Sequence, residues 1–75
     1  MNQEIYRVEQ ALKNDANFST IKNIEQFSEL VHKIYWNRFD IVKEIQKASL
    51  WIMANPKRVK RNYARYLTNW LARKR

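Results

Sequence analysis

Basic side chains near the C-terminus are the residues of this sequence best suited to chemistry, because they can bind phosphate groups. Arg58, Arg61 and Arg65 recur at intervals of three and four residues, which places them on one face of a helix. No acidic residue lies nearby in the sequence to relieve the repulsion between them. A phosphate or carboxylate group on a partner would remove that penalty. The candidate nucleic-acid-binding residues are therefore Lys57, Arg58, Lys60, Arg61, Arg65 and Arg73.

The net charge of +8 is unevenly distributed along the 75 residues. Residues 1–44 carry six basic and seven acidic side chains, whereas residues 45–75 carry nine basic side chains and no acidic one. Such asymmetry indicates a polyanionic partner, most often nucleic acid, and DNA is the partner we expect. The alternatives are an anionic membrane surface, an acidic protein, or a solvated basic face that only keeps the protein soluble.

The basic residues belong to a predicted C-terminal helix over residues 55–75. Asn55 is a favourable N-cap residue, and Pro56 suits the first helical position, where a backbone N–H would have no partner in any case. Trp70 lies at the centre of the apolar face of this helix, so we expect it in the core. That face consists of Val59, Tyr63, Tyr66, Leu67, Trp70 and Leu71.

Apolar periodicity predicts three further helices upstream. The first spans about residues 3–13, the second runs from Ser19 or Thr20 to Trp36, and the third follows the N-cap residue Asp40 and ends near residue 54. The predicted core face of the second helix consists of Ile21, Ile24, Phe27, Leu30, Val31 and Ile34.

Short polar turns join the predicted helices. The chain contains no glycine, so asparagine is the residue expected to adopt a left-handed conformation, and we place it in the turn at residues 14–17. No pattern indicates strands or a linker. The predicted fold is all-α: residues 1–75 form a single domain, a small bundle of three longer helices and a shorter N-terminal one.

Trp36 and Trp51 are candidates for stacking on nucleic-acid bases. Trp51 lies outside the apolar arc of the third helix, so that helix is either covered on two sides or presents Trp51 as a platform beside Lys47. Because a central helix is often packed on two sides, we favour the core position for Trp51. The same two alternatives apply to Trp36, and base stacking becomes the leading explanation for either ring if it is exposed.

Residue types that support catalysis or metal binding are scarce. The absence of glycine and cysteine excludes a glycine-rich phosphate loop, disulfides and thiolate metal sites. His32 is the only histidine, and we expect it at the surface or at the boundary of the core. We therefore expect no enzyme, no metal site and no cofactor. No apolar run approaches the length of a membrane span, and the first residues lack the pattern of a secretory signal, so we expect a soluble intracellular protein.

Two runs near the C-terminus carry a resemblance to a known family. Residues 51–58 read Trp-Ile-Met-Ala-Asn-Pro-Lys-Arg, and residues 62–73 contain Tyr-Ala-Arg-Tyr followed by Asn-Trp-Leu-Ala-Arg. Residues 51–73 resemble the C-terminal segment of bacteriophage DNA replication proteins of the initiator and helicase-loader type. The resemblance implies a role in phage DNA replication in the cytoplasm of a bacterial host, either contacting DNA near an origin or binding the replicative helicase.

Those segments usually end larger proteins that carry a winged-helix or ATPase region upstream, for which this chain has no room. We therefore expect either a stand-alone accessory protein or an excised terminal domain, and we assign to it no sequence-specific or ATP-driven activity. We expect it to bind DNA phosphates through its basic C-terminal helix. The alternative is a protein-interaction module that binds a replicative helicase or another replication protein, with Leu50 or Trp51 as an exposed anchor. A second copy of this small chain is a further candidate partner.

Overall fold

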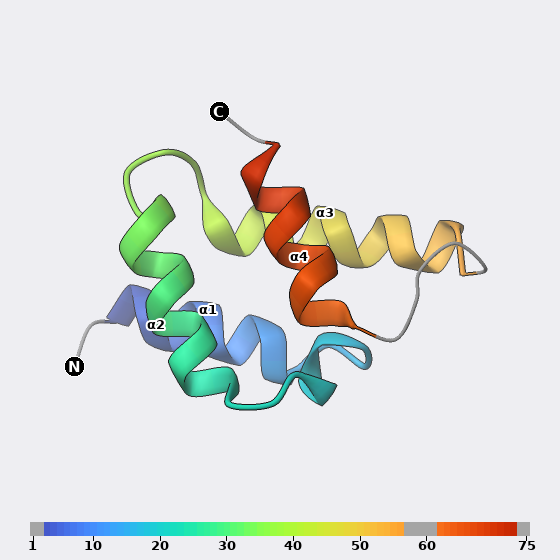
Figure 1. Cartoon of the computed structure of the whole chain (residues 1–75), viewed down its shortest axis with the longest axis horizontal. Coiled ribbons are helices and arrows are strands. Elements are labelled where there is room, and N and C mark those ends of the chain that lie inside the picture. The colour runs from blue at the N-terminus through green and yellow to red at the C-terminus, as the bar shows by residue number, and fades with distance from the viewer. Residues whose placement is uncertain (1–2, 57–61, 74–75) are drawn as a thin grey trace.

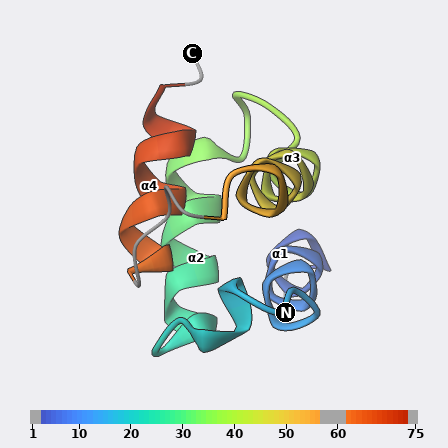
Figure 2. The same ribbon diagram turned by 90° about the vertical axis from the view of Figure 1, so that its right-hand side faces the viewer.

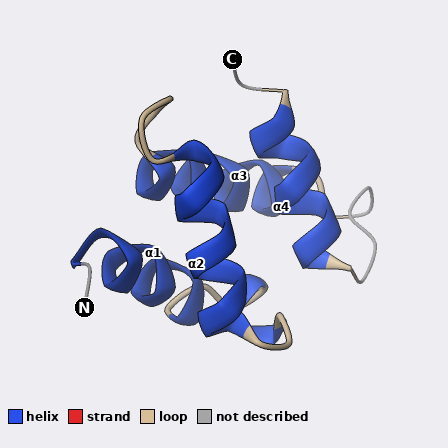
Figure 3. Ribbon diagram, turned by 60° about the vertical axis from the view of Figure 1, so that its left-hand side comes forward, coloured by secondary structure: helices blue, strands red, loops and turns tan. Residues whose placement is uncertain are grey.

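The computed structural model describes residues 3–56 and 62–73, and these residues form helices and loops without strands (Figures 1 and 3). The all-α prediction is confirmed at this level. A short 3₁₀-helix, η1, lies between the first two α-helices. The elements in chain order are α1 (Gln3–Lys13), η1 (Phe18–Thr20), α2 (Ile24–Tyr35), α3 (Ile41–Ala54) and α4 (Tyr63–Ala72).

The helices form two crossed layers. In Figure 2, α1 and α3 are seen nearly end-on and side by side, while α2 and α4 stand upright in the second layer. Helix α1 packs against α2 and α3, and α4 packs against α3 and η1. The helix lengths also differ from the prediction, since α1 has 11 residues and α4 has 10. The N-terminal helix is therefore not the shortest.

Helices α1 and α3 have the bounds that the sequence predicts. The Oδ1 atom of Asp40 accepts a hydrogen bond from the backbone N–H of Lys43 at 3.2 Å, so the predicted N-cap of α3 is present. Residues spaced by three and four turn inward along α3. The buried apolar core consists of Val8, Leu12, Phe18, Val31, Ile41, Ile45, Ala48, Ile52, Leu67 and Leu71.

Phe18 is the largest fully buried side chain, although it lies outside every predicted helical face. Its ring contacts Tyr63 edge-on at 6.2 Å between centroids and stacks with Tyr66 at 6.5 Å. Phe18 therefore connects the turn after α1 to helix α4. Contacts of this kind add about 0.5–1.5 kcal/mol beyond the burial of apolar area.

A carboxylate holds Phe18 in this position. Oδ1 of Asp15 accepts hydrogen bonds from the backbone N–H groups of Asn17 at 2.8 Å and Phe18 at 2.9 Å. Oδ2 of Asp15 accepts a further hydrogen bond from the hydroxyl of Ser49 on α3. One side chain thus satisfies two backbone donors of the turn and ties that turn to α3.

The second helix begins later than predicted. Helix α2 starts at Ile24, because Asn23 adopts a left-handed conformation with φ 55° and ψ 48° that interrupts helical winding. Asparagine takes this conformation as expected for a chain without glycine, but at Asn23 and not in the turn at residues 14–17.

Two residues of the predicted core face of α2 are exposed. Leu30 and Ile34 expose 53% and 57% of their surface. The buried residues of α2 are Ser28, Val31 and His32, while Ile24 and Phe27 of the predicted face are partly buried against the core. The predicted apolar arc was therefore wider than the surface that the neighbouring helices cover.

The predicted start of the C-terminal helix at Asn55 is wrong. The N–H of Asn55 donates to the carbonyls of Trp51 and Ile52, so this residue closes α3 and does not open a new helix. Helix α4 is opened by Asn62, whose Oδ1 accepts the N–H of Arg65 at 3.0 Å. Val59, which was predicted on the apolar face, lies outside the described residues.

We predict that Asp15→Ala lowers the free energy of unfolding by about 2 kcal/mol, because two backbone N–H groups and a hydroxyl lose their acceptor. Urea unfolding followed by circular dichroism measures this loss. Asp40→Ala, which removes an ordinary N-cap, is the control and should cost about 1 kcal/mol. Equal losses in the two variants would contradict a central role for Asp15.

Candidate nucleic-acid interface

The outer face of α4 exposes arginine and is free of acidic residues. Arg65 and the C-cap residue Arg73 are exposed, whereas Leu67 and Leu71 on the opposite face are fully buried. Within residues 3–56 and 62–73, neither guanidinium forms an ion pair with a carboxylate. The predicted separation of an apolar inner face from a basic outer face therefore holds for the described part of α4.

The other four predicted phosphate-binding residues belong to the sequence between α3 and α4. Lys57, Arg58, Lys60 and Arg61 lie outside the described residues. The structure therefore describes two of the six candidates, Arg65 and Arg73.

Among the described residues, the carboxylates that form ion pairs do so with lysine or histidine and not with Arg65 or Arg73. Glu4 and Glu9 belong to α1, and Glu44 belongs to α3. The ion pairs among the described residues are Lys13 with Glu9 at 3.3 Å, Lys13 with Glu25 at 3.8 Å, His32 with Glu4 at 2.8 Å, and Lys47 with Glu44 at 3.4 Å.

Trp51 lies at the contact between α3 and α4, and its favoured placement in the core is wrong. The residue exposes 36% of its surface, while its ring stacks on Tyr66 with a centroid distance of 6.0 Å and an interplanar angle of 29°. Tyr66 in turn contacts Trp70 at 6.2 Å. Helix α4 covers one part of the Trp51 ring and leaves the rest to solvent.

A buried carboxylate docks α4 onto α3. Trp70 is partly buried rather than central to the core, and its Nε1–H donates to Oε1 of Glu44 at 3.3 Å. Glu44 exposes 6% of its surface and also pairs with Lys47. An indole N–H at a packed contact needs an acceptor, which Glu44 supplies. Glu44 was not identified from the sequence as part of this contact. The only signal in the sequence was its position one turn from Ile41 and Ala48, on the core face of α3.

The phenol of Tyr66 lies inside this contact. Its oxygen is buried and has no hydrogen-bond partner among the described residues. Burial raises the pKa of Tyr66 above its ordinary value of 10.0, and the positive charge of Arg73 opposes part of this rise. The phenol therefore stays protonated at neutral pH and adds no negative charge beside the arginines.

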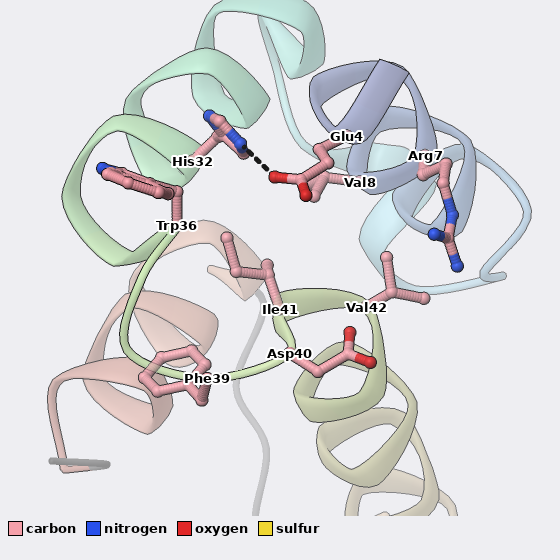
Figure 4. Close-up of a pocket in the computed structure, with 9 residues that line it drawn as sticks. All are labelled: Glu4, Arg7, Val8, His32, Trp36, Phe39, Asp40, Ile41 and Val42. Carbon is pink, nitrogen blue, oxygen red and sulfur yellow. Dashed lines mark hydrogen bonds and ion pairs between the residues drawn. The ribbon is translucent and has the colours of Figure 1, made fainter. Parts of the chain in front are cut away.

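Trp36 lies elsewhere, at a cavity of about 210 Å³ formed by α1, the end of α2 and the start of α3. Figure 4 shows Trp36 and Phe39 on one side of this cavity and Arg7 and Val42 on the other. Trp36 exposes 59% of its surface. The cavity is lined by Glu4, Arg7, Val8, His32, Trp36, Phe39, Asp40, Ile41 and Val42.

His32 is buried at this cavity, so its predicted place at the surface or core boundary is wrong. It exposes 9% of its surface, and its Nε2 lies 2.8 Å from Oε2 of Glu4 (Figure 4). The partner from α1 removes most of the cost of burying a polar ring. Periodicity within α2 alone could not reveal a partner that lies 28 residues away in the sequence.

The two candidate stacking residues are not brought together. Ile41 lines the cavity beside Trp36, and Trp51 lies about 15 Å further along α3. Only Trp51 contacts α4, the helix that carries Arg65 and Arg73. The geometry therefore assigns Trp51, and not Trp36, to the candidate interface.

Comparison of the chain with protein-family models, with curated proteins and with solved structures finds no match. Across the described residues, no group of three or more histidine, cysteine or acidic side chains could hold a metal ion. Within the same ranges, no helix combines the length and the apolar character that crossing a lipid bilayer requires.

We predict that the stability of the protein falls as the pH rises above about 10, in part through Tyr66. The raised pKa means that the folded state holds the phenolic proton more tightly than the unfolded chain, so ionisation favours unfolding. Tyr66→Phe should show a smaller drop in Tm between about pH 9 and pH 11. Tyr6→Phe, which removes an exposed phenol, is the control, and the same drop in both variants would refute the assignment.

Proposed function

We propose that this chain is a small nucleic-acid-binding accessory module of phage-type DNA replication that contacts DNA phosphates through its basic C-terminal region. We place its action in the cytoplasm of a bacterial host and propose binding without enzymatic activity. One observation carries the proposal: the outer face of α4 exposes Arg65 and Arg73, and no described carboxylate neutralises either one.

The energetics of α4 support an anionic partner. Burial of Leu67 and Leu71 together with the hydrogen bond from Trp70 to Glu44 docks the helix, so the outer arginines are not needed for folding. Arg65 lies in the first turn of α4, where the helix dipole disfavours a cation by about 0.3–1 kcal/mol. A phosphate bound at this position would interact favourably with the helix dipole, because its charge is negative.

The sequence strengthens the electrostatic attraction. Four of the five residues between Pro56 and Asn62 are lysine or arginine, and residues 45–75 contain no acid. Each phosphate contact releases counterions from the nucleic acid, so affinity should depend steeply on salt. The resemblance of residues 51–73 to phage replication proteins agrees with this class of partner.

We predict that Arg65→Glu/Arg73→Glu weakens binding to a fluorescent DNA oligonucleotide about 10-fold or more at low salt. The slope of log affinity against log salt should fall by about 0.7 per lost contact on single-stranded DNA and about 0.9 on duplex. Fluorescence anisotropy at several salt concentrations measures both quantities.

The control is Lys22→Glu/Lys33→Glu, which changes the net charge equally at two exposed positions away from α4. It should retain most of the affinity and the wild-type salt slope. If both double variants lose the same affinity, net charge alone governs binding and α4 is not the interface.

The second candidate function is docking to a replication protein such as the replicative helicase. Leu50 and Met53 on α3 expose 67% and 72% of their surface, the two highest values among the exposed large apolar side chains of the described residues. They border a groove between α1 and α3 that includes Ala11 and Ile45. Apolar anchors beside a groove are typical of protein interfaces.

We predict that Leu50→Gln/Met53→Gln abolishes co-elution with the helicase in nuclease-treated samples while leaving DNA affinity unchanged. A complex anchored by apolar contacts should survive about 0.5 M salt, where charge pairs are strongly screened. Arg65→Glu/Arg73→Glu is the matched comparison. Loss of the complex only in the arginine variant would exclude Leu50 and Met53 as anchors.

A further inference from the structure

We propose that Trp51 is a stacking platform for an unpaired base, which makes single-stranded nucleic acid the substrate class of the α4 interface. This inference rests on the proposed function and assigns the form of nucleic acid that the site accepts. The ring of Trp51 is both exposed and fixed by a neighbour, because the residue leaves 36% of its surface in solvent while the ring stacks on Tyr66.

The support beneath Trp51 is rigid. Tyr66 stacks on Phe18 with an interplanar angle of 20° and contacts Trp70 at 6.2 Å, and Phe18 is fully buried. Trp51 is therefore the outermost ring of an aromatic cluster that begins in the core. A ring fixed by its neighbours loses little conformational entropy when a base stacks on it, which favours binding.

Each of the two helices carries a basic residue close in sequence to a ring of the platform. Arg65, the neighbour of Tyr66 in the sequence, is exposed on α4 without an ion pair among the described residues. Lys47 lies one turn before Trp51 on α3, and its side chain remains 52% exposed while it pairs with Glu44. An aromatic ring beside basic side chains is the arrangement that binds a base and its adjacent phosphates in single strands.

The requirement for an unpaired base follows from the geometry of duplex DNA. The faces of paired bases are covered by their neighbours in the stack, so an aromatic ring on a protein surface reaches them only after unstacking. An unpaired base exposes its face at no such cost. Stacking on Trp51 should therefore add affinity for single strands and none for duplex.

Trp36 shows that exposure of a tryptophan ring is not by itself sufficient for a base-stacking site. It is more exposed than Trp51, yet its cavity contains the carboxylates of Glu4 and Asp40 (Figure 4). With Arg7 counted, the lining still carries one more carboxylate than arginine, so it disfavours the phosphates on either side of a base. Trp36 is therefore an internal control: an exposed tryptophan of the same chain in an environment unsuited to nucleic acid.

The test compares Trp51→Ala, Trp51→Phe and Trp36→Ala on four ligands of equal length: oligo-dT, oligo-rU, a duplex, and an abasic DNA strand. Trp51→Ala should weaken binding to oligo-dT about 10-fold or more, with the salt slope unchanged. Trp51→Phe should retain part of the affinity. Trp51→Ala should bind the duplex with the same affinity as the wild type, and it should also match the wild type on the abasic strand. Trp36→Ala should behave as wild type on every ligand.

A second measurement does not depend on how Trp51→Ala folds. In Trp36→Phe, the remaining fluorescence comes from Trp51 and Trp70, and oligo-dT should quench it while the abasic strand does not. Comparison of oligo-dT with oligo-rU distinguishes DNA from RNA as the source of the unpaired base. Equal quenching by the abasic strand would overturn the stacking proposal.

The outcomes separate this inference from the proposed function. If Arg65→Glu/Arg73→Glu weakens binding to all four ligands while Trp51→Ala changes none of them, phosphate binding stands and base stacking is refuted. If the wild type binds none of the four ligands, both proposals are refuted. A loss confined to oligo-dT and oligo-rU in Trp51→Ala, together with a loss on all four ligands in Arg65→Glu/Arg73→Glu, supports both.

Discussion

The carboxylate of Asp15 is the interaction on which the rest of the structure depends. It accepts the N–H groups of Asn17 and Phe18 and the hydroxyl of Ser49, so one side chain shapes the turn after α1 and ties it to α3. The turn places Phe18 in the core, where its ring meets Tyr66 of α4. Without glycine, the chain has few other ways to stabilise so compact a turn.

The orientation of α4 depends on a polar contact as well as on apolar packing. Burial of Leu67 and Leu71 would allow the helix to rotate or slide slightly, because apolar contacts are not directional. The hydrogen bond from Trp70 to the buried carboxylate of Glu44 fixes the register of the helix on α3. That register turns Arg65 outward and lays Tyr66 against Trp51. The candidate interface is thus a consequence of how α4 is docked.

Much of the fold could be predicted from periodicity and capping, since α1 and α3 have the expected bounds and the described residues are all-α. Phe18 escaped prediction because a 3₁₀-helix of three residues has no periodic pattern. Asn55 and Asn62 are both favourable N-cap residues, and only the hydrogen bonds that close α3 decide between them. Local sequence does not contain that information.

The candidate site was predictable to a similar extent. The exposure of Arg65 and Arg73 follows from helical spacing. The environments of Trp36 and Trp51 depend on which helix covers which face, and that is a property of tertiary packing.

The attachment of α4 to the rest of the protein has a further consequence. Undocking would break its contacts with α3 and η1 but leave those joining α1 to α2 and α3 intact. Because a helix of 10 residues is marginal alone, it would melt as it detached, so a ligand bound on α4 would reinforce both its helical order and its docking.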